Sequence, residues 1–95
     1  MVKALKIHPR DNVAVVLADA KAGEAVEVIT DSGVLHLDAR GDIAFGHKIA
    51  LGNLTAHQPI IKYGEEIARA QTVIAAGDWI HLHNVYCRRG HENQE

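Results

Sequence analysis

The segment "AGEAVEV" (Ala22–Val28) joins a glycine turn to an alternating apolar segment, and it sets the pattern for the chain. Looser copies occur as "AHQPIIK" (Ala56–Lys62) and "AGDWIHL" (Ala76–Leu82). Each copy has alanine, then glycine or histidine, then an acid or amide, then one free position, and finally valine or isoleucine. Glycine permits the turn and the β-branched residue enters a sheet. The unit is too short for a solenoid, so it indicates recurring turns in one small β domain.

Short alternating or apolar segments occupy much of the remaining chain and are typical of an all-β protein. Gly, Asp and Asn separate them, and they read "VKALKI", "NVAVVL", "EAVEVI", "VLHLDA", "IIKY" and "DWIHLH". The Ala-rich segments "GHKIALGNL" and "EEIARAQTVI" are expected to add one or two short helical turns. We therefore predict an all-β domain over residues 1–86. Residues 87–95, which include "RRGHENQE", are predicted to form a flexible charged tail.

The composition limits the classes of function that remain open. Ninety-five residues, 47% of them apolar but few aromatic, suffice for one domain with a modest aliphatic core. A net charge of -2 gives no electrostatic pattern for nucleic acid. No apolar run is long enough to span a membrane, and the first residues do not resemble a signal peptide. The single cysteine, Cys87, cannot form an internal disulfide. We expect a cytoplasmic protein that binds neither nucleic acid nor membrane.

The segment "DWIHLHNV" (Asp78–Val85) contains a pair of histidines separated by one residue. In a strand, Ile80 and Leu82 would face the core, and His81 and His83 would share the opposite face. Two neutral imidazoles suit a divalent metal, or proton transfer near neutral pH. From the spacing alone, an exposed strand face that merely tolerates histidine is the favoured interpretation, because a site needs third and fourth ligands that the motif does not name. A functional pair is the alternative.

Other polar groups stand next to predicted turns. "FGHKIAL" (Phe45–Leu51) places a histidine and a lysine where they could bind a carboxylate or act as acid and base. "IKYGEEIARA" (Ile61–Ala70) offers a lysine and a tyrosine before a glycine. "HPRDNVAV" (His8–Val15) contains Asp-Asn, a pair that commonly bonds to nearby backbone amides. For each of these motifs an ordinary surface turn is the structural alternative.

Taken in order, "HPRDNVAV", "GHKIAL", "IIKYGEEIARA" and "AGDWIHLHNV" resemble the SAF domain of altronate and galactarate dehydratases, from about Ile7 to Val85. The small subunit of sulfolactate sulfo-lyase is similar too. The resemblance implies a β-clip fold, a small all-β arrangement with long hairpins. The chain departs from the family at 66–68, where a Pro-Ile-Gly-like step is usual, and at His57, where glycine is common. The His-x-His ending favours the altronate or sulfolactate side of the family.

The resemblance implies the small subunit or N-terminal domain of a metal-dependent lyase. Such an enzyme eliminates water from an altronate-type sugar acid, or sulfite from sulfolactate. A larger catalytic chain would complete the site, so the isolated chain is expected to be inactive. Divalent iron or manganese is expected in the complete enzyme and need not bind this chain alone. Homo-oligomer formation stays open.

Carried over by position, the resemblance also assigns roles to individual residues. The catalytic residues would be His47, Lys48, His81 and His83, with His81 and His83 also serving as metal ligands. The substrate-binding residues would be Asp11, Asn12, Lys62, Tyr63 and Asn84. The alternative from another class is a non-catalytic SAF module that binds a ligand or a partner. A plain metal-binding protein is a third interpretation.

Overall fold

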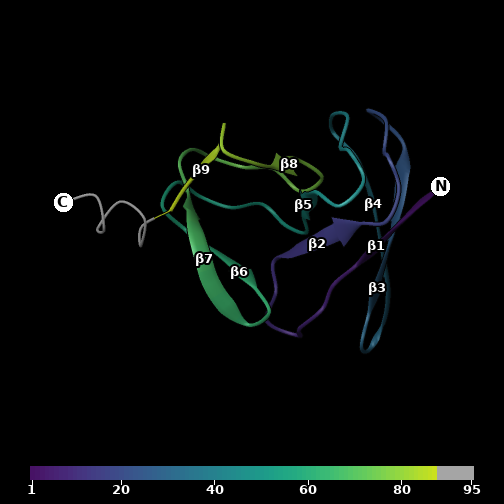
Figure 1. Ribbon diagram of the computed structural model, residues 1–95, viewed down its shortest axis with the longest axis horizontal. Coiled ribbons are helices and arrows are strands. Elements are labelled where there is room, and N and C mark those ends of the chain that lie inside the picture. Colours follow the sequence, from purple (N-terminus) through teal and green to yellow (C-terminus); the bar gives the residue numbers. More distant parts are fainter. Residues whose placement is uncertain (88–95) are drawn as a thin grey trace.

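The computed structural model describes residues 1–87 and contains only strands and turns there, so none of those residues forms a helix that could cross a membrane (Figure 1). The strands are β1 (Val2–Leu5), β2 (Val13–Val16), β3 (Ala25–Thr30), β4 (Gly33–Asp38), β5 (Lys48–Ala50), β6 (Pro59–Lys62), β7 (Glu65–Ala70), β8 (Trp79–Ile80) and β9 (Val85–Tyr86). The prediction of a small all-β domain is confirmed. The predicted tail lies outside the described residues from position 88 onward.

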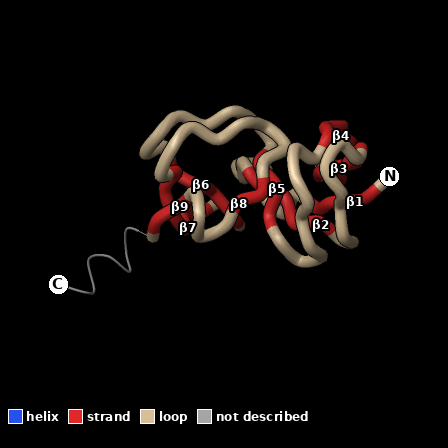
Figure 2. Tube along the Cα trace, turned by 90° about the horizontal axis from the view of Figure 1, so that it is seen from above, coloured by secondary structure: helices blue, strands red, loops and turns tan. Residues whose placement is uncertain are grey.

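The strands form two sheets. A six-stranded sheet has the order β4-β3-β1-β2-β5-β8, and a three-stranded sheet has the order β6-β7-β9. Strands β1 and β3 pair in parallel, whereas the other pairs are antiparallel. The hairpins β3–β4 and β6–β7 lie at opposite ends of the molecule, and long turns connect the shorter strands between them (Figures 1 and 2). This arrangement places β8 at the sheet edge opposite β4.

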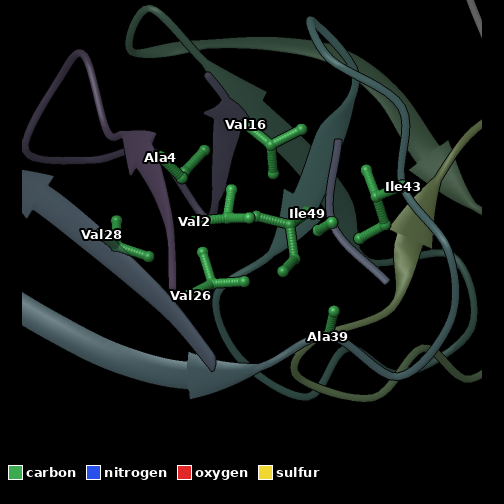
Figure 3. Close-up of a cluster of buried hydrophobic side chains, with 10 residues drawn as sticks. Val2, Ala4, Val16, Val26, Val28, Ala39, Ile43 and Ile49 are labelled. Atoms are coloured by element: carbon green, nitrogen blue, oxygen red, sulfur yellow. The ribbon is translucent and has the colours of Figure 1, made fainter. Parts of the chain in front are cut away.

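The core is aliphatic and has two parts. On one face of the six-stranded sheet, Val2, Ala4, Val26 and Val28 pack with the connecting turns, which contribute Ile43 (Figure 3). The second part lies between the sheets and consists of Val13, Ala50, Leu54, Ile60, Ala68, Ala70, Ile74 and Ile80. Burying each Val or Ile side chain contributes roughly 1.5–3 kcal/mol relative to exposure. The core therefore fixes how the two sheets sit against each other.

The two Ala-rich segments are strands and turns, so the prediction of helical turns there was wrong. "GHKIALGNL" contains β5, and "EEIARAQTVI" contains β7. In β7, Ala68 and Ala70 alternate into the core between the sheets, which is the two-residue period of a strand. Alanine has the highest intrinsic helix propensity, but such propensities are small and tertiary packing overrides them here.

Six turns in the described part of the chain share one hydrogen-bond pattern. In each, the backbone N–H of the fourth residue donates to the carbonyl of the first, over 8–11, 21–24, 44–47, 55–58, 75–78 and 81–84. In five of these turns, the side chain of the fourth residue also accepts a hydrogen bond from the backbone N–H of the first residue, at 2.8–3.1 Å. These accepting residues are Asp11, Glu24, Gln58, Asp78 and Asn84. Among these six turns, only the one that ends at His47 lacks the side-chain bond, because the His47 ring bonds to Trp79 instead.

The turn–strand repeat has four copies rather than the three visible in the sequence. The additional copy, second in chain order, is "FGHKIAL" (Phe45–Leu51), in which phenylalanine replaces the usual alanine. The copies associate in pairs through antiparallel bridges, Ala20 with Ile43 and Leu54 with Ile74. Each copy has a positive φ at the third turn residue, and the third copy carries this at His57, with φ of 70°. The fold is therefore built from two similar pairs of turns that feed the sheets.

Candidate functional site

Three histidines gather around the indole of Trp79. The His81 ring stacks on the indole at a centroid distance of 4.6 Å, and the His83 ring lies 5.0 Å from it. The His47 ring lies 5.6 Å from Trp79 and stacks on His81 at 5.4 Å. The structure thus brings together the second repeat and the end of the fourth, which are more than 30 residues apart in sequence. We call these four residues the ring cluster.

The ring cluster has one internal hydrogen bond. The indole Nε1 of Trp79 donates to Nδ1 of His47 at 3.1 Å. An indole N–H can only donate, so the accepting Nδ1 carries no proton. Sequence reasoning did not assign a role to Trp79. Its position within "DWIHLHNV", as the chain's single tryptophan, was the available signal.

The histidine pair does not lie on a strand, so the predicted burial of Leu82 beside Ile80 was wrong. Strand β8 ends at Ile80, and residues 81–84 form a turn. Ile80 is buried, but the Leu82 side chain is 80% exposed. The rings of His81 and His83 still lie on one side, with centroids 6.4 Å apart, because the turn and the indole bring them there.

Asn84 holds this turn in place. Its buried side chain accepts a hydrogen bond from the His81 N–H at 3.0 Å and donates one to the Trp79 carbonyl at 2.8 Å. Both bonds are internal to the protein and give Asn84 a structural role. The prediction that Asn84 binds substrate stays untested.

Replacing Asn84 by alanine should lower the free energy of unfolding by about 1–3 kcal/mol, because buried backbone groups lose their partners. The turn that carries His81 and His83 should loosen at the same time. Urea unfolding would measure the first effect, and the chemical shifts of the two imidazoles would report the second. Asn53→Ala is a suitable control, because Asn53 also caps a turn through its side chain but is exposed and lies outside this turn.

Two lysines add positive charge beside the ring cluster. Lys48 follows His47 and lies opposite Ile80 in the sheet. Burial and the nearby charge of Lys62 lower the pKa of Lys48. Lys48 and His81 both line an open pocket of about 410 Å³ whose apolar wall includes Ile60 and Ile80. A bound anion at this position would offset the repulsion between the two ammonium groups.

Tyr63 lies next to Lys62 at the tip of the β6–β7 hairpin. The tyrosine is 56% exposed and has φ of 56°, an unusual conformation for a residue other than glycine. The Nζ of Lys62 stands 4.9 Å from the centre of the Tyr63 ring. Gly64 completes the turn against the His8 ring, which leaves no room for a Cβ. The phenol is thus held out into solvent beside a cation, where it is available to a ligand.

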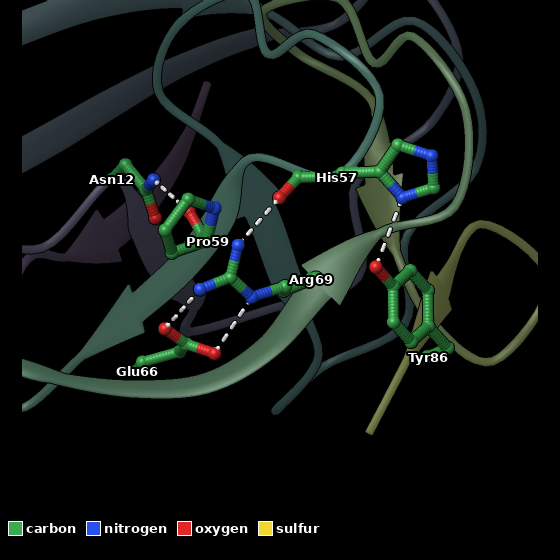
Figure 4. A network of polar contacts seen from close by, with 6 residues as sticks. All are labelled: Asn12, His57, Pro59, Glu66, Arg69 and Tyr86. Atoms are coloured by element: carbon green, nitrogen blue, oxygen red, sulfur yellow. Dashed lines mark hydrogen bonds and ion pairs between the residues drawn. The ribbon is translucent and has the colours of Figure 1, made fainter. Parts of the chain in front are cut away.

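Asp11 and Asn12 fasten the first loop to this hairpin. Buried Asp11 accepts hydrogen bonds from the N–H groups of His8 and Gly64, at 3.1 and 2.8 Å. Asn12 donates to the Pro59 carbonyl at 2.9 Å (Figure 4) and accepts from the Ile61 N–H at 2.8 Å. These contacts give both side chains a structural role, and the prediction that they bind substrate stays untested.

A second polar group lies on the three-stranded sheet, apart from the ring cluster. Arg69 forms two hydrogen bonds with Glu66, each at 3.0 Å, and donates to the His57 carbonyl at 3.1 Å (Figure 4). Nδ1 of His57 lies 2.9 Å from the Tyr86 hydroxyl. These contacts involve His57 and Glu66, two positions at which the sequence departs from the expected family pattern. They join β7 and β9 to the third repeat, so the departures are structurally accommodated.

The predicted metal ligands do not make a complete site by themselves. Among residues 1–87, no group of three or more His, Cys, Asp or Glu residues could hold a metal ion. Catalytic metal sites usually have three protein ligands. His81 and His83 could supply at most two of these ligands.

Comparisons with known proteins agree with this structure. A family model described as the altronate/galactarate dehydratase SAF domain matches residues 2–88. Altronate dehydratase from Escherichia coli is 46% identical over 80 residues, which cover 84% of this chain and 15% of that protein. Altronate dehydratase from Bacillus subtilis is 39% identical over 80 residues, which again cover 84% of this chain and 15% of that protein.

A third relative has almost the same length as this chain. Subunit alpha of (2R)-sulfolactate sulfo-lyase from Chromohalobacter salexigens is 30% identical over 87 residues, which cover 87% of this chain and 93% of that subunit. The chain therefore spans about 15% of the altronate dehydratases and nearly all of the sulfo-lyase subunit.

Proposed function

Because the chain belongs to the family of altronate/galactarate dehydratase SAF domains, we propose that it is the small subunit or N-terminal domain of a lyase. The lyase would eliminate water from an altronate-type sugar acid, or sulfite from sulfolactate. The chain would supply one wall of the active site, and a larger catalytic polypeptide would supply the remainder. The convergence of His47, His81, His83 and Lys48 is the observation that carries this proposal.

The chemistry of such an elimination matches these groups. A base takes the proton next to the substrate carboxylate, the resulting enediolate needs stabilisation, and the leaving group needs a hydrogen-bond or proton donor. Lys48 and Lys62 would bind the substrate's anionic groups, which relieves their mutual repulsion. His81 and His83 would exchange protons or hydrogen bonds with the reacting oxygen. Tyr63 would add a further hydrogen bond from the hairpin tip.

The larger polypeptide would cover exposed apolar side chains that lie next to the histidines of the ring cluster in sequence. Leu82, between the two histidines, is 80% exposed, and Phe45, two residues before His47, is 65% exposed. A free-standing chain would leave both in water. A partner that closes over the histidines would bury them, and this continuity with the site is why we assign them to the partner contact. The relative named subunit alpha agrees with a second, larger subunit.

Leu82→Asp should weaken binding to the larger polypeptide by at least about tenfold, because burial of a leucine is worth roughly 1.5–3 kcal/mol. Isothermal titration calorimetry would measure the dissociation constant. Leu35→Asp is the matched control: Leu35 is 46% exposed on β4, at the opposite edge of the sheet. Equal weakening by both substitutions, or by neither, would contradict this placement of the interface.

The divalent iron or manganese expected in the complete enzyme would take most of its ligands from the larger polypeptide. His81 and His83 are the only predicted ligands in this chain. Titration of the isolated chain with iron(II) or manganese(II) should therefore give only weak binding. Tight stoichiometric binding without a partner would favour a plain metal-binding protein.

The proposed function can be tested by reconstitution. The larger dehydratase-like polypeptide of the same genome would be purified with this chain and assayed with altronate and with sulfolactate. We expect formation of a 2-oxo acid from altronate or release of sulfite from sulfolactate. A stable complex that acts on neither substrate would favour a non-catalytic binding module.

A further inference from the structure

His47 departs from the rule that governs the other turns of this fold. Five of the six turns with the shared pattern end in Asp, Glu, Asn or Gln, whose side chain accepts the N–H of the first turn residue. In the turn 44–47 the backbone bond is kept, at 3.0 Å, but the imidazole of His47 bonds to Trp79 instead. The His47 ring lines an open pocket together with Trp79. A local rule broken at one position, with the side chain redirected toward a pocket, is typical of a functional residue.

The redirected bond determines which nitrogen of His47 carries the proton. Trp79 Nε1–H donates to His47 Nδ1 at 3.1 Å, so Nδ1 must keep its lone pair. A neutral ring then carries its proton on Nε2. A histidine with one nitrogen fixed in this way presents a defined hydrogen-bonding group at the other.

We infer that Trp79 is a positioning residue: it holds His47 as the Nε2–H tautomer, so that His47 offers an N–H donor to an anionic oxygen of the substrate. Lys48 is the next residue and lines a different pocket together with His81, whose ring stacks on His47. His47 would donate its N–H to a carboxylate oxygen of the substrate or to the developing enediolate. The assignment of the substrate rests on the proposed function, whereas the tautomer rests on the geometry alone.

Trp79 also orders the other two imidazoles. It contacts His81 at 4.6 Å and His83 at 5.0 Å between ring centroids. A phenylalanine at this position would keep most of the stacking area but would lack the N–H donor. Trp79→Phe therefore separates the hydrogen bond to His47 from the packing of the cluster.

The tautomer can be measured without any enzyme activity. In the isolated wild-type chain at a pH where the ring is neutral, ¹⁵N NMR should show an unprotonated Nδ1 and a protonated Nε2 for His47. In Trp79→Phe the two ring nitrogens should move toward a mixture of tautomers. A wild-type His47 protonated on Nδ1, or a tautomer unchanged in Trp79→Phe, would overturn the inference whatever the protein's function.

The consequence for catalysis is measured in the reconstituted enzyme. Trp79→Phe should reduce kcat/KM by about tenfold or more, because a misoriented His47 N–H donor stabilises the transition state less. Tyr86→Phe is the matched control, because it removes a similar contact to His57, which lies outside the ring cluster. Full activity of Trp79→Phe with a shifted tautomer would overturn the positioning role while leaving the proposed function intact.

His47→Gln provides the complementary test. Glutamine follows the rule seen at Gln58, whose side chain caps its own turn at 3.0 Å. The variant should therefore unfold at the same temperature as the wild type or higher, yet turn over substrate about 100-fold more slowly. A large loss of thermal stability would show that His47 serves the fold, and unchanged turnover would show that it does not serve the reaction.

Discussion

Replacing both His81 and His83 by alanine should reduce turnover of the complete enzyme by about 100-fold or more while the chain still folds. Positioned acid–base groups contribute about 10²–10⁴-fold to such reactions. The fold should survive because the turn 81–84 is held by the backbone and by Asn84, not by the imidazoles. Steady-state kinetics of the reconstituted complex would measure the loss.

Two further measurements make this result interpretable. His36→Ala should leave turnover unchanged, because His36 is an exposed histidine on β4, at the far edge of the sheet. Calorimetry should show that the doubly substituted chain still binds the larger polypeptide. A fully active double variant would remove these histidines from the reaction.

Gly77→Ala should destabilise the domain by about 3–4 kcal/mol, the largest effect we expect from a single small substitution. Gly77 is buried and has φ of 92°, and an added Cβ would overlap the carbonyl oxygen of Asp38. Relief of that overlap would disturb two backbone hydrogen bonds, from Gly77 N–H to Ala50 and from Arg40 N–H to Gly77. Urea unfolding would measure the change.

Two other glycines separate the causes of this loss. Gly23 occupies the equivalent turn position with φ of 83°, but a Cβ there meets open space. Gly23→Ala should therefore cost only about 1–2 kcal/mol, the cost of the backbone conformation alone. Gly52 has open space around it and no positive φ, so Gly52→Ala should change stability by no more than about 0.5 kcal/mol. Similar losses for Gly23→Ala and Gly77→Ala would contradict the role of the Asp38 contact.

The strands that the sequence predicted well are those with clear apolar alternation. Residues 24–29 and 34–39 were expected as strands and lie close to β3 and β4. Strands β5 and β7 were harder to predict because their alanines favour helix intrinsically, whereas here they are buried between the sheets. The second repeat was missed because phenylalanine stands at position 45, where the other copies have alanine.

The sequence singled out His47, His81 and His83 but neither Trp79 nor the geometry of the ring cluster. The histidine pair was expected on a strand, yet Asn84 closes a turn there and Leu82 is exposed. The proximity of Lys48 and Lys62 depends on how the β6–β7 hairpin packs against the larger sheet, which no local pattern encodes. The bond from Trp79 to His47 likewise joins two repeats that the sequence does not pair.

The most direct test of the account is the activity of the larger polypeptide with and without residues 1–95, supplied separately or fused. We expect elimination from altronate or sulfolactate to require this chain, and activity to rise to a plateau as the chain saturates its partner. Full activity of the larger polypeptide without these residues would contradict the claim that they form one wall of the active site.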